Sequence, residues 1–201
     1  MGSILAYSLI KNHTHDVVSE IVHHFHEEGH TFFEKGDLNL NIIGIRSPDR
    51  HSGEYNDYIC CVYKDNGDWL YKAWRATTDP GLPYRKRPMN SKGCAILKAG
   101  QYRGAYQIGL HKGKYEALVQ RGGQVTVYRD NNKDDTLDRL TEDSGYFGIN
   151  IHKSLRHHQE VGLYSAGCQV FQNSHDFKEF MLLVKRSSVL YGDTFTYTLI
   201  E

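Results

Sequence analysis

The chain has 201 residues, enough for one domain with a sizeable hydrophobic core or for two small ones. Lys plus Arg and Asp plus Glu both number 24, so the formal net charge is zero and gives no electrostatic reason to expect a nucleic-acid partner. No apolar run approaches the roughly 20 residues that span a bilayer, so no membrane span is expected. Because the chain has no internal repeat and no Pro/Ser-rich linker, we predict a single domain over residues 1–201.

The first part of the chain contains three predicted elements. An apolar run over residues 4–10 predicts a β-strand; it lacks the basic region and the cleavage site of a secretion signal, so no such signal is expected. Apolar positions with helical spacing predict a helix that begins between Asn12 and Asp16 and ends near Gly29. Alternating apolar and polar residues over 38–42 predict a half-buried strand.

A hairpin is the clearest local signal in the middle of the chain. Strand-like runs over residues 58–63 and 69–74 flank Asn66-Gly67, and these two residue types accept the positive φ angles of a type I′ turn. A second turn is predicted over residues 78–81. The remaining predicted elements are strands over residues 95–97, 106–111, 115–120, 125–129, 147–152 and 195–199, and a helix capped by Ser174.

Eight to ten short strands and two helices follow from these patterns. The 14 Tyr and 19 Gly residues agree with β-structure that contains many tight turns. Turns rather than crossover helices separate the strands, which favours antiparallel or mixed pairing. We therefore predict a mainly β (α+β) fold, a β-sandwich or barrel of mixed, mostly antiparallel strands with one helix near each end.

The four cysteines do not form a disulfide or zinc pattern. Cys60 and Cys61 are adjacent, so they point to opposite faces of a strand, and no Cys-x-x-Cys sequence occurs. We interpret Cys60, Cys61 and Cys94 as small packing residues. Cys168 differs from them because of the residues around it.

The stretch from Gly148 to Cys168 is the one that indicates chemistry. A nucleophilic cysteine needs a base or a cation that favours its thiolate, and backbone N–H groups that can surround an oxyanion. His152 ends an alternating strand, so its side chain points away from the apolar layer. Gly167 precedes Cys168 and allows a tight turn. The 15 residues between His152 and Cys168, read as a solvated loop or lid, are enough to fold back and bring the two side chains together.

This arrangement resembles the L,D-transpeptidase (YkuD-like) family. The family signature is a His at the end of a strand, a loop, and then Ser/Thr-His-Gly-Cys, with the Cys about sixteen residues after the His. Here His152 and Cys168 are sixteen positions apart, and Ser165 and Gly167 match the second half of the signature. Asn173 matches an Asn that members commonly carry five residues after the Cys. The family is built on a mainly β barrel or sandwich, which agrees with the strand count.

The motif covers roughly residues 148–173, and the rest of the chain matches in architecture, with Thr77–Gly81 similar to an upstream Thr-Pro-Gly turn of the family. The family's second His is Ala166 here, the Arg or Asn often found two residues after the Cys is Val170, and the small residue after the catalytic His is Lys153. These changes leave the nucleophile and the base in place and affect the substrate contacts.

The resemblance implies a role for each residue of the motif. Cys168 would be the thiolate that attacks the carbonyl of an L-centred diamino acid, next to a D-amino acid, in a peptidoglycan stem peptide. His152, oriented by the backbone carbonyl of Lys153, would raise the thiolate population and then protonate the leaving amine. The N–H groups of Cys168 and Gly167 would face the oxyanion, while Ser165 would shape the turn. The candidate substrate contacts are His111, Asn150, Ala166 and Asn173. No cofactor or metal is implied.

The acyl-enzyme could react in two ways. An amine acceptor gives a transpeptidase, whereas water gives an L,D-carboxypeptidase or endopeptidase, and both use Cys168 and His152. With no secretion signal expected, the protein would be made in the cytoplasm and act at the cell wall, for example as a phage lysin or virion component. The oligomeric state stays open.

Two other functions remain open. A non-catalytic cell-wall-binding or virion structural module could keep this fold, and the replacement of the second His by Ala166 favours that alternative. A zinc peptidase that uses His111, His152 and a carboxylate is a more distant one, because no His-Glu-x-x-His or similar spacing occurs.

Two further patterns favour structural interpretations. The histidines around the first helix, His13, His15, His23, His24, His26 and His30, indicate a solvated His-rich face rather than a zinc site, because no Cys or carboxylate is spaced to complete a tetrahedral set. Residues 130–135 carry oxygens at the first, third and fifth positions of a calcium loop. However, Asp135 replaces the Gly of the sixth position and Thr141 stands at the twelfth, so a polar turn is favoured and calcium binding stays open.

Overall fold

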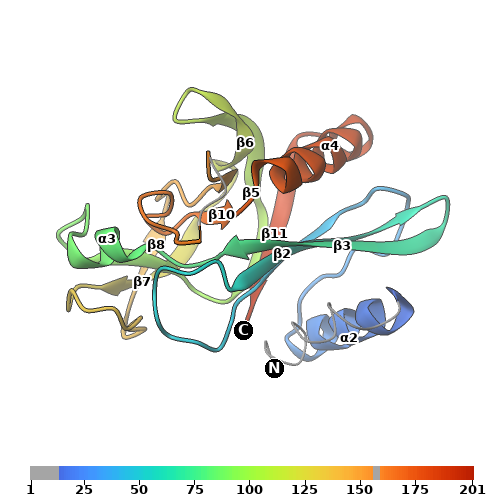
Figure 1. The fold of residues 1–201 in the computed structure, drawn as a ribbon. Helices are drawn as coiled ribbons and strands as arrows, with labels where there is room; N and C mark the ends of the chain where they lie inside the picture. The colour runs from blue at the N-terminus through green and yellow to red at the C-terminus, as the bar shows by residue number, and fades with distance from the viewer. Residues whose placement is uncertain (1–13, 156–158) are drawn as a thin grey trace.

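The structure, a computed structural model, describes residues 14–155 and 159–201. Eight strands close into a barrel, which in spatial order consists of β1 (Asn41–Ile45), β11 (Thr194–Ile200), β5 (Gly100–His111), β6 (Tyr115–Gln120), β9 (Ile151–Lys153), β10 (Gln169–Phe171), β3 (Asp68–Thr77) and β2 (Asp57–Asp65). A separate small sheet consists of β4 (Cys94–Leu97), β7 (Val125–Asp130) and β8 (Thr141–Gly145) (Figure 1). The helices in these two described ranges are α2 (Thr14–Glu27), α3 (Leu82–Lys86) and α4 (Ser174–Tyr191).

The prediction of a mainly β fold with mixed pairing is confirmed, and the barrel is closed. Most neighbouring strands are antiparallel, while β1–β11 and β9–β10 are parallel. The helix expected near the N-terminus is present as α2, and the one expected near the C-terminus is present as α4. The strand predicted over residues 4–10 lies outside the described residues. In the described part of the chain, none of the helices combines the length and apolar character that a bilayer crossing needs.

The hairpin prediction is confirmed in position and in turn type. Strands β2 and β3 pair from Asp57 opposite Ala76 to Asp65 opposite Asp68, and Asn66 and Gly67 both have positive φ angles, 54° and 85°. A type I′ turn matches the right-handed twist of the two strands.

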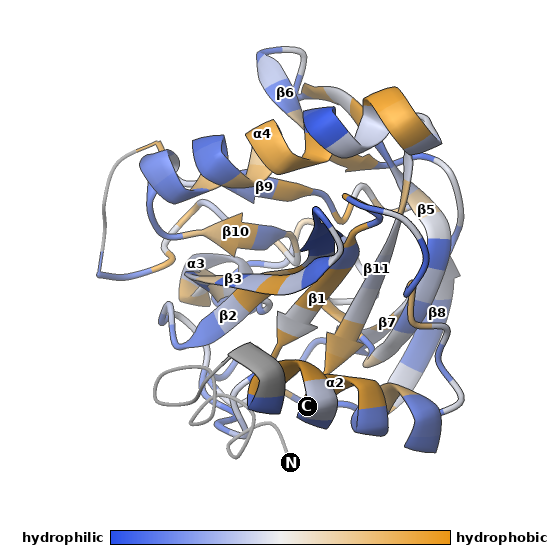
Figure 2. Ribbon diagram, turned by 90° about the vertical axis from the view of Figure 1, so that its right-hand side faces the viewer, coloured by the Kyte–Doolittle hydropathy of each residue, from blue (hydrophilic) through white to orange (hydrophobic). Residues whose placement is uncertain are grey.

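The prediction of a half-buried strand over 38–42 is wrong in both position and burial. The strand β1 begins three residues later, and all five of its residues are buried. Ile42 packs inside the barrel, whereas Ile43 and Ile45 pack on its outer side against α2, which presents Ile21 and Phe25. Figure 2 shows α2 across these strands with its apolar side toward them. A strand with both faces buried has no reason to alternate apolar and polar residues.

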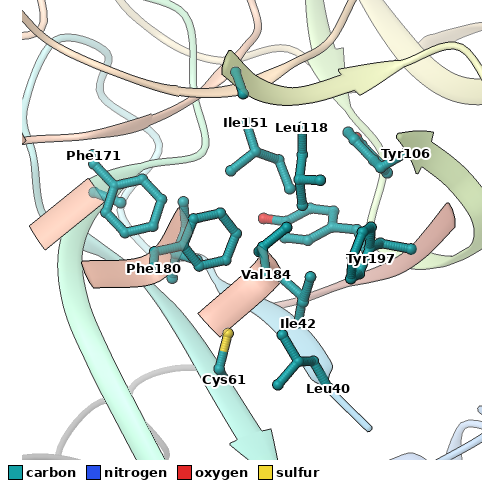
Figure 3. Close-up of a cluster of buried hydrophobic side chains, with 14 of the residues drawn as sticks. Leu40, Ile42, Cys61, Tyr106, Leu118, Ile151, Phe171, Phe180, Val184 and Tyr197 are labelled. Carbon is teal, nitrogen blue, oxygen red and sulfur yellow. The ribbon is translucent and has the colours of Figure 1, made fainter. Parts of the chain in front are cut away.

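The main core fills the barrel and continues under α4. Tyr106, Leu118, Ile151 and Tyr197 converge there from four barrel strands (Figure 3). The helix α4 adds the buried residues Phe177, Phe180, Met181 and Val184 to the same cluster. Cys60 and Cys61 lie in the outer and inner clusters respectively, as predicted from their adjacency.

Further elements differ from the sequence predictions. The strand predicted over residues 147–152 is observed as β9, which begins only at Ile151, and β10 was not predicted. The strand β8, with sequence Thr-Glu-Asp-Ser-Gly, was not predicted because it carries no apolar residue, and the one-turn helix α3 was not predicted either. The helix α4 is capped by Asn173, not by Ser174: the Asn173 side chain accepts a hydrogen bond from the His175 N–H at 2.8 Å.

Candidate active site

The candidate site lies on the outer face of two neighbouring parallel strands, β9 and β10, close to α4 (Figure 2). The register pairs Gln169 with Ile151 and Val170 with His152. Ile151 points into the barrel core, so His152 points outward. Just before the two strands, the Gln169 N–H donates to the Asn150 carbonyl at 2.9 Å, and the Asn150 N–H faces the Cys168 thiol. Cys168 therefore lies beside Asn150, two residues before His152, at the end of the strand pair from which the His152 side chain projects.

His152 is held in one orientation and one tautomer. Its Nδ1 lies 3.0 Å from the backbone carbonyl of Lys153, and because a carbonyl only accepts, Nδ1 carries the proton. The Tyr115 hydroxyl donates to the same carbonyl at 3.3 Å. The Nε2 atom is buried and has no hydrogen-bond partner among the described residues. Its lone pair is thus available to accept a proton. This is the arrangement expected if the Lys153 carbonyl orients the imidazole of His152 to act as a base.

A second histidine lies directly against the first. The rings of His111 and His152 are stacked with centroids 3.9 Å apart and 25° between their planes. Asn150 Oδ1 accepts the Gln120 backbone N–H at 2.9 Å, so its Nδ2 faces His111 Nδ1 at 3.1 Å and donates to it. The proton of a neutral His111 is therefore on Nε2. This series of hydrogen bonds, from Gln120 through Asn150 to His111, fixes the imidazole ring on which His152 stacks.

Gln120 is a residue that sequence reasoning missed. Its Oε1 accepts the backbone N–H groups of Phe147, Gly148 and Ile149 at 2.9, 2.9 and 3.3 Å. Its Nε2 donates to the Gly123 and Gly145 carbonyls at 2.9 and 3.0 Å. One buried amide thereby shapes the backbone that leads into β9. Only its position at the end of an apolar strand could have drawn attention to it.

The turn that carries Cys168 is held by Ser165. The Ser165 hydroxyl donates to the Cys168 carbonyl at 2.7 Å and accepts the Gly167 N–H at 3.1 Å, as expected for a residue that shapes the turn. Gly167 has a φ of 126°, and a Cβ there would lie 2.5 Å from the Ala95 carbonyl oxygen, so glycine is required. The Ser165 carbonyl in turn accepts the Gly81 N–H at 2.9 Å, which joins the turn to the Thr77–Gly81 segment.

The geometry changes the expected oxyanion donors. Because the Gly167 N–H already donates to Ser165, it is engaged in this structure. The Cys168 N–H has no hydrogen-bond partner within residues 14–155 and 159–201. Of the two predicted donors, only the Cys168 N–H is free in the described structure.

Burial keeps the thiol and both imidazoles neutral at pH 7. It raises the pKa of Cys168 to about 11, although the Asn150 N–H and the charge of Lys112 oppose the shift. Burial also lowers the pKa of His152 to about 3, with a further contribution from His111, and that of His111 to about 4. The Cys168 side chain is partly exposed, and its Sγ donates to the Gly148 carbonyl at 3.4 Å. The resting pair is thiol and imidazole rather than thiolate and imidazolium.

The predicted substrate contacts fall into two groups. His111 and Asn150 lie in the hydrogen-bonded cluster around His152. Ala166 lines a neighbouring cavity of about 350 Å³, together with Phe147 and Ile149. Asn173 instead has a structural role as the cap of α4, and its predicted contact with substrate stays a prediction.

Residues from the two sequence patterns considered for metal binding interact with other side chains of the protein. Asp130 of the calcium-like segment is buried, forms an ion pair with the buried Arg85 and accepts the Asp138 N–H at 2.6 Å. On α2, His23 is exposed as predicted and lies 3.2 Å from Glu27, whereas His24 is buried, so the prediction of a solvated position is wrong for His24. Within the described residues, no three or more His, Cys, Asp or Glu side chains are grouped to hold a metal ion. His13 lies outside the described residues.

Comparison with known proteins adds no identification to this geometry. No protein-family model matches the chain, and no curated protein or solved structure is significantly similar to it.

Proposed function

We propose that this protein is a cysteine-dependent enzyme acting on peptidoglycan stem peptides, as an L,D-transpeptidase or as an L,D-carboxypeptidase or endopeptidase. The observation that carries the proposal is the relation between His152 and Cys168. An imidazole whose Nδ1 is fixed by a carbonyl and whose Nε2 has no partner projects from the strand pair at whose end a partly exposed thiol lies. The substrate class comes from the L,D-transpeptidase-like motif, and action at the cell wall follows from it.

The first half of the reaction forms a thioester. The Cys168 thiol hydrogen, donated to the Gly148 carbonyl in the resting structure, turns toward His152 Nε2. As Sγ attacks the scissile carbonyl carbon, the proton passes to Nε2 and the carbonyl oxygen becomes an oxyanion that the Cys168 N–H can bind. The C–N bond then breaks, and the leaving amine takes the proton from Nε2.

The second half regenerates the thiol. An acceptor amine or a water molecule attacks the thioester carbonyl while Nε2 removes its proton, and the sulfur leaves and is reprotonated. The neutral resting pair determines the timing of the first proton transfer. Because burial disfavours both thiolate and imidazolium, the proton moves as the sulfur attacks, rather than beforehand.

Incubation with purified muropeptides tests the proposal. Their mass spectra before and after incubation should show new crosslinks, loss of a D-amino acid or cleaved bridges, and each product identifies a different reaction. The changes should be absent with Cys168→Ala. Unchanged muropeptides with a folded wild-type protein would contradict the proposed activity.

A non-catalytic wall-binding or virion module is the second candidate, and the raised pKa of the Cys168 thiol supports it. In that case the protein should sediment with isolated cell walls, and Cys168→Ala should sediment equally well without any muropeptide being altered.

A further inference from the structure

A cavity of about 350 Å³ lies beside the reactive turn and has no role in the mechanism described above. One wall is the segment that leads into β9, with Phe147 and Ile149, and another is Ala166 of the Cys168 turn. Further lining residues come from α3 and β4, with Tyr84 and Ala95 among them. Its volume falls within the range of small-ligand sites.

Gly148 connects the lining of the cavity to the thiol. Both neighbours of Gly148 line the cavity, and its carbonyl accepts the Cys168 thiol at 3.4 Å. A Cβ built on Gly148 would have no neighbouring atom within 4 Å, so the backbone at this point borders open space. A group bound in the cavity would therefore lie next to the carbonyl that Cys168 attacks.

Arg129 is the charged residue of this lining. Its guanidinium lies over the Phe147 ring, 4.6 Å from the centroid, and its side chain is 7% exposed. Nε donates to Asp143 at 3.1 Å and Nη1 to the Gly93 carbonyl at 3.4 Å, whereas Nη2 has no partner among the described residues. Asp143 is shared with Lys92 at 3.3 Å, so the two cations exceed the one carboxylate by a unit of charge. An anchored guanidinium with a free N–H group is suited to a carboxylate.

We propose that this cavity is a subsite for a carboxylate-bearing residue of the peptide substrate, next to the scissile bond, with the carboxylate bound by Arg129. The inference rests on the proposed function of Cys168 and extends it to substrate selection. The apolar part of the residue would pack against Phe147 and Ile149. A peptide with a free carboxylate one residue from the scissile carbonyl should be preferred over its amide.

Binding to a protein that cannot react tests the subsite separately from catalysis. In the Cys168→Ala protein, N-acetyl-L-lysyl-D-alanine and its C-terminal amide would be titrated and followed by nuclear magnetic resonance. The carboxylate form should bind at least ten times more tightly than the amide and should shift the Gly93 amide and Arg129 Nε–H signals. Arg129→Gln, added to Cys168→Ala, should remove this preference, whereas Arg103→Gln, an exposed arginine of β5, should leave it unchanged.

A second variant covers the case in which loss of Arg129 disturbs the fold. Ala166→Leu fills the cavity from its other wall and keeps the Arg129 contacts, so it should weaken binding of both peptides. Equal binding of carboxylate and amide, or a preference that survives Arg129→Gln, would overturn the subsite. Acylation of Cys168 in the wild type is measured independently. A carboxylate preference without acylation would support the subsite and contradict the proposed enzymatic function. Acylation without the preference would support the enzymatic function and contradict the subsite.

Discussion

The rings of His111 and His152 stack face to face, 3.9 Å between centroids, so two imidazoles share one buried space beside Cys168. Each Nδ1 has a different partner: the Lys153 carbonyl for His152 and the Asn150 amide for His111. The two rings therefore carry their protons on different nitrogens and are both neutral at pH 7. Protonation of either ring would place a charge against the other, which accounts for part of the lowered pKa of His152.

This pair makes the stability of the protein depend on pH. In the unfolded chain His111 binds a proton near pH 6.5, whereas in the folded protein it does so near pH 4. Between these values the unfolded chain binds more protons, so the stability contributed by neutral His111 is present above pH 6.5 and is lost as the pH falls toward 4. His111→Phe keeps a stacked ring and removes this titration.

Urea unfolding at several pH values between 4 and 6.5 measures the effect. The free energy of unfolding of His111→Phe should fall less steeply with decreasing pH than that of the wild type, by up to about 1.4 kcal/mol per pH unit. Parallel curves for the two proteins would show that His111 is already protonated in the folded state. Gln124→Phe, at an exposed position that carries no titratable group, is the control and should leave the wild-type slope unchanged.

The thiol of Cys168 should be slow to react with simple alkylating reagents. With its pKa raised to about 11, only a minute fraction is thiolate at pH 7.5, and the rate of alkylation by iodoacetamide should rise about tenfold per pH unit over pH 7 to 9.5. Peptide mapping by mass spectrometry separates Cys168 from the buried Cys60, Cys61 and Cys94. A rate that reaches a plateau near pH 7 would indicate a preformed thiolate and contradict the neutral pair.

Loss of the Gln120 side-chain amide should destabilise the protein. Gln120→Leu removes the partner of three backbone N–H groups and two carbonyls around β9, and we expect a cost of about 2–4 kcal/mol in urea unfolding. Gln124→Leu, an exposed position on the same connection, should change stability by less than about 0.5 kcal/mol. Equal effects of the two variants would mean that water replaces the amide at little cost.

The buried ion pair between Arg85 and Asp130 joins α3 to β7, and both side chains are almost fully buried. Arg85→Met leaves the carboxylate without its cation, so thermal and urea unfolding should show a loss of about 3–5 kcal/mol. The double variant Arg85→Met/Asp130→Leu should lose less than the sum of the single variants, because no unpaired charge remains. Strict additivity would show that the two side chains do not interact energetically.

The sequence was most informative where a local rule acts alone. The Asn66-Gly67 turn and the amphipathic pattern of α2 depend on backbone conformation and on one buried face, and both were predicted correctly. The position of β1 was predicted wrongly, because α2 covers its outer face and its residues therefore do not alternate between apolar and polar. The strand β8 has no apolar residue and exists because β7 offers it hydrogen bonds, which a local pattern does not reveal.

In the candidate site, too, the features that follow from local sequence could be predicted and those that depend on distant contacts could not. The sixteen-residue spacing of His152 and Cys168 indicated that a folded-back loop could bring them together, and the parallel register of β9 and β10 sets His152 opposite Val170, two residues after Cys168. The roles of Gln120 and Arg129 depend on contacts with segments 14 to 36 residues away, between elements whose pairing no single stretch encodes. The engagement of the Gly167 N–H by Ser165 likewise depends on the final shape of the turn.

Acylation of Cys168 by a carbapenem is the most direct measurement of the proposed chemistry, because opening of the strained lactam forms a stable thioester without a separate leaving group. Intact-protein mass spectrometry should show one added carbapenem on the wild type and none on Cys168→Ala. His152→Gln should slow the addition by roughly 10²–10⁴-fold, the usual contribution of a general base. No adduct on the wild type, or an adduct that forms as fast without the imidazole of His152, would contradict a Cys168 nucleophile served by that base.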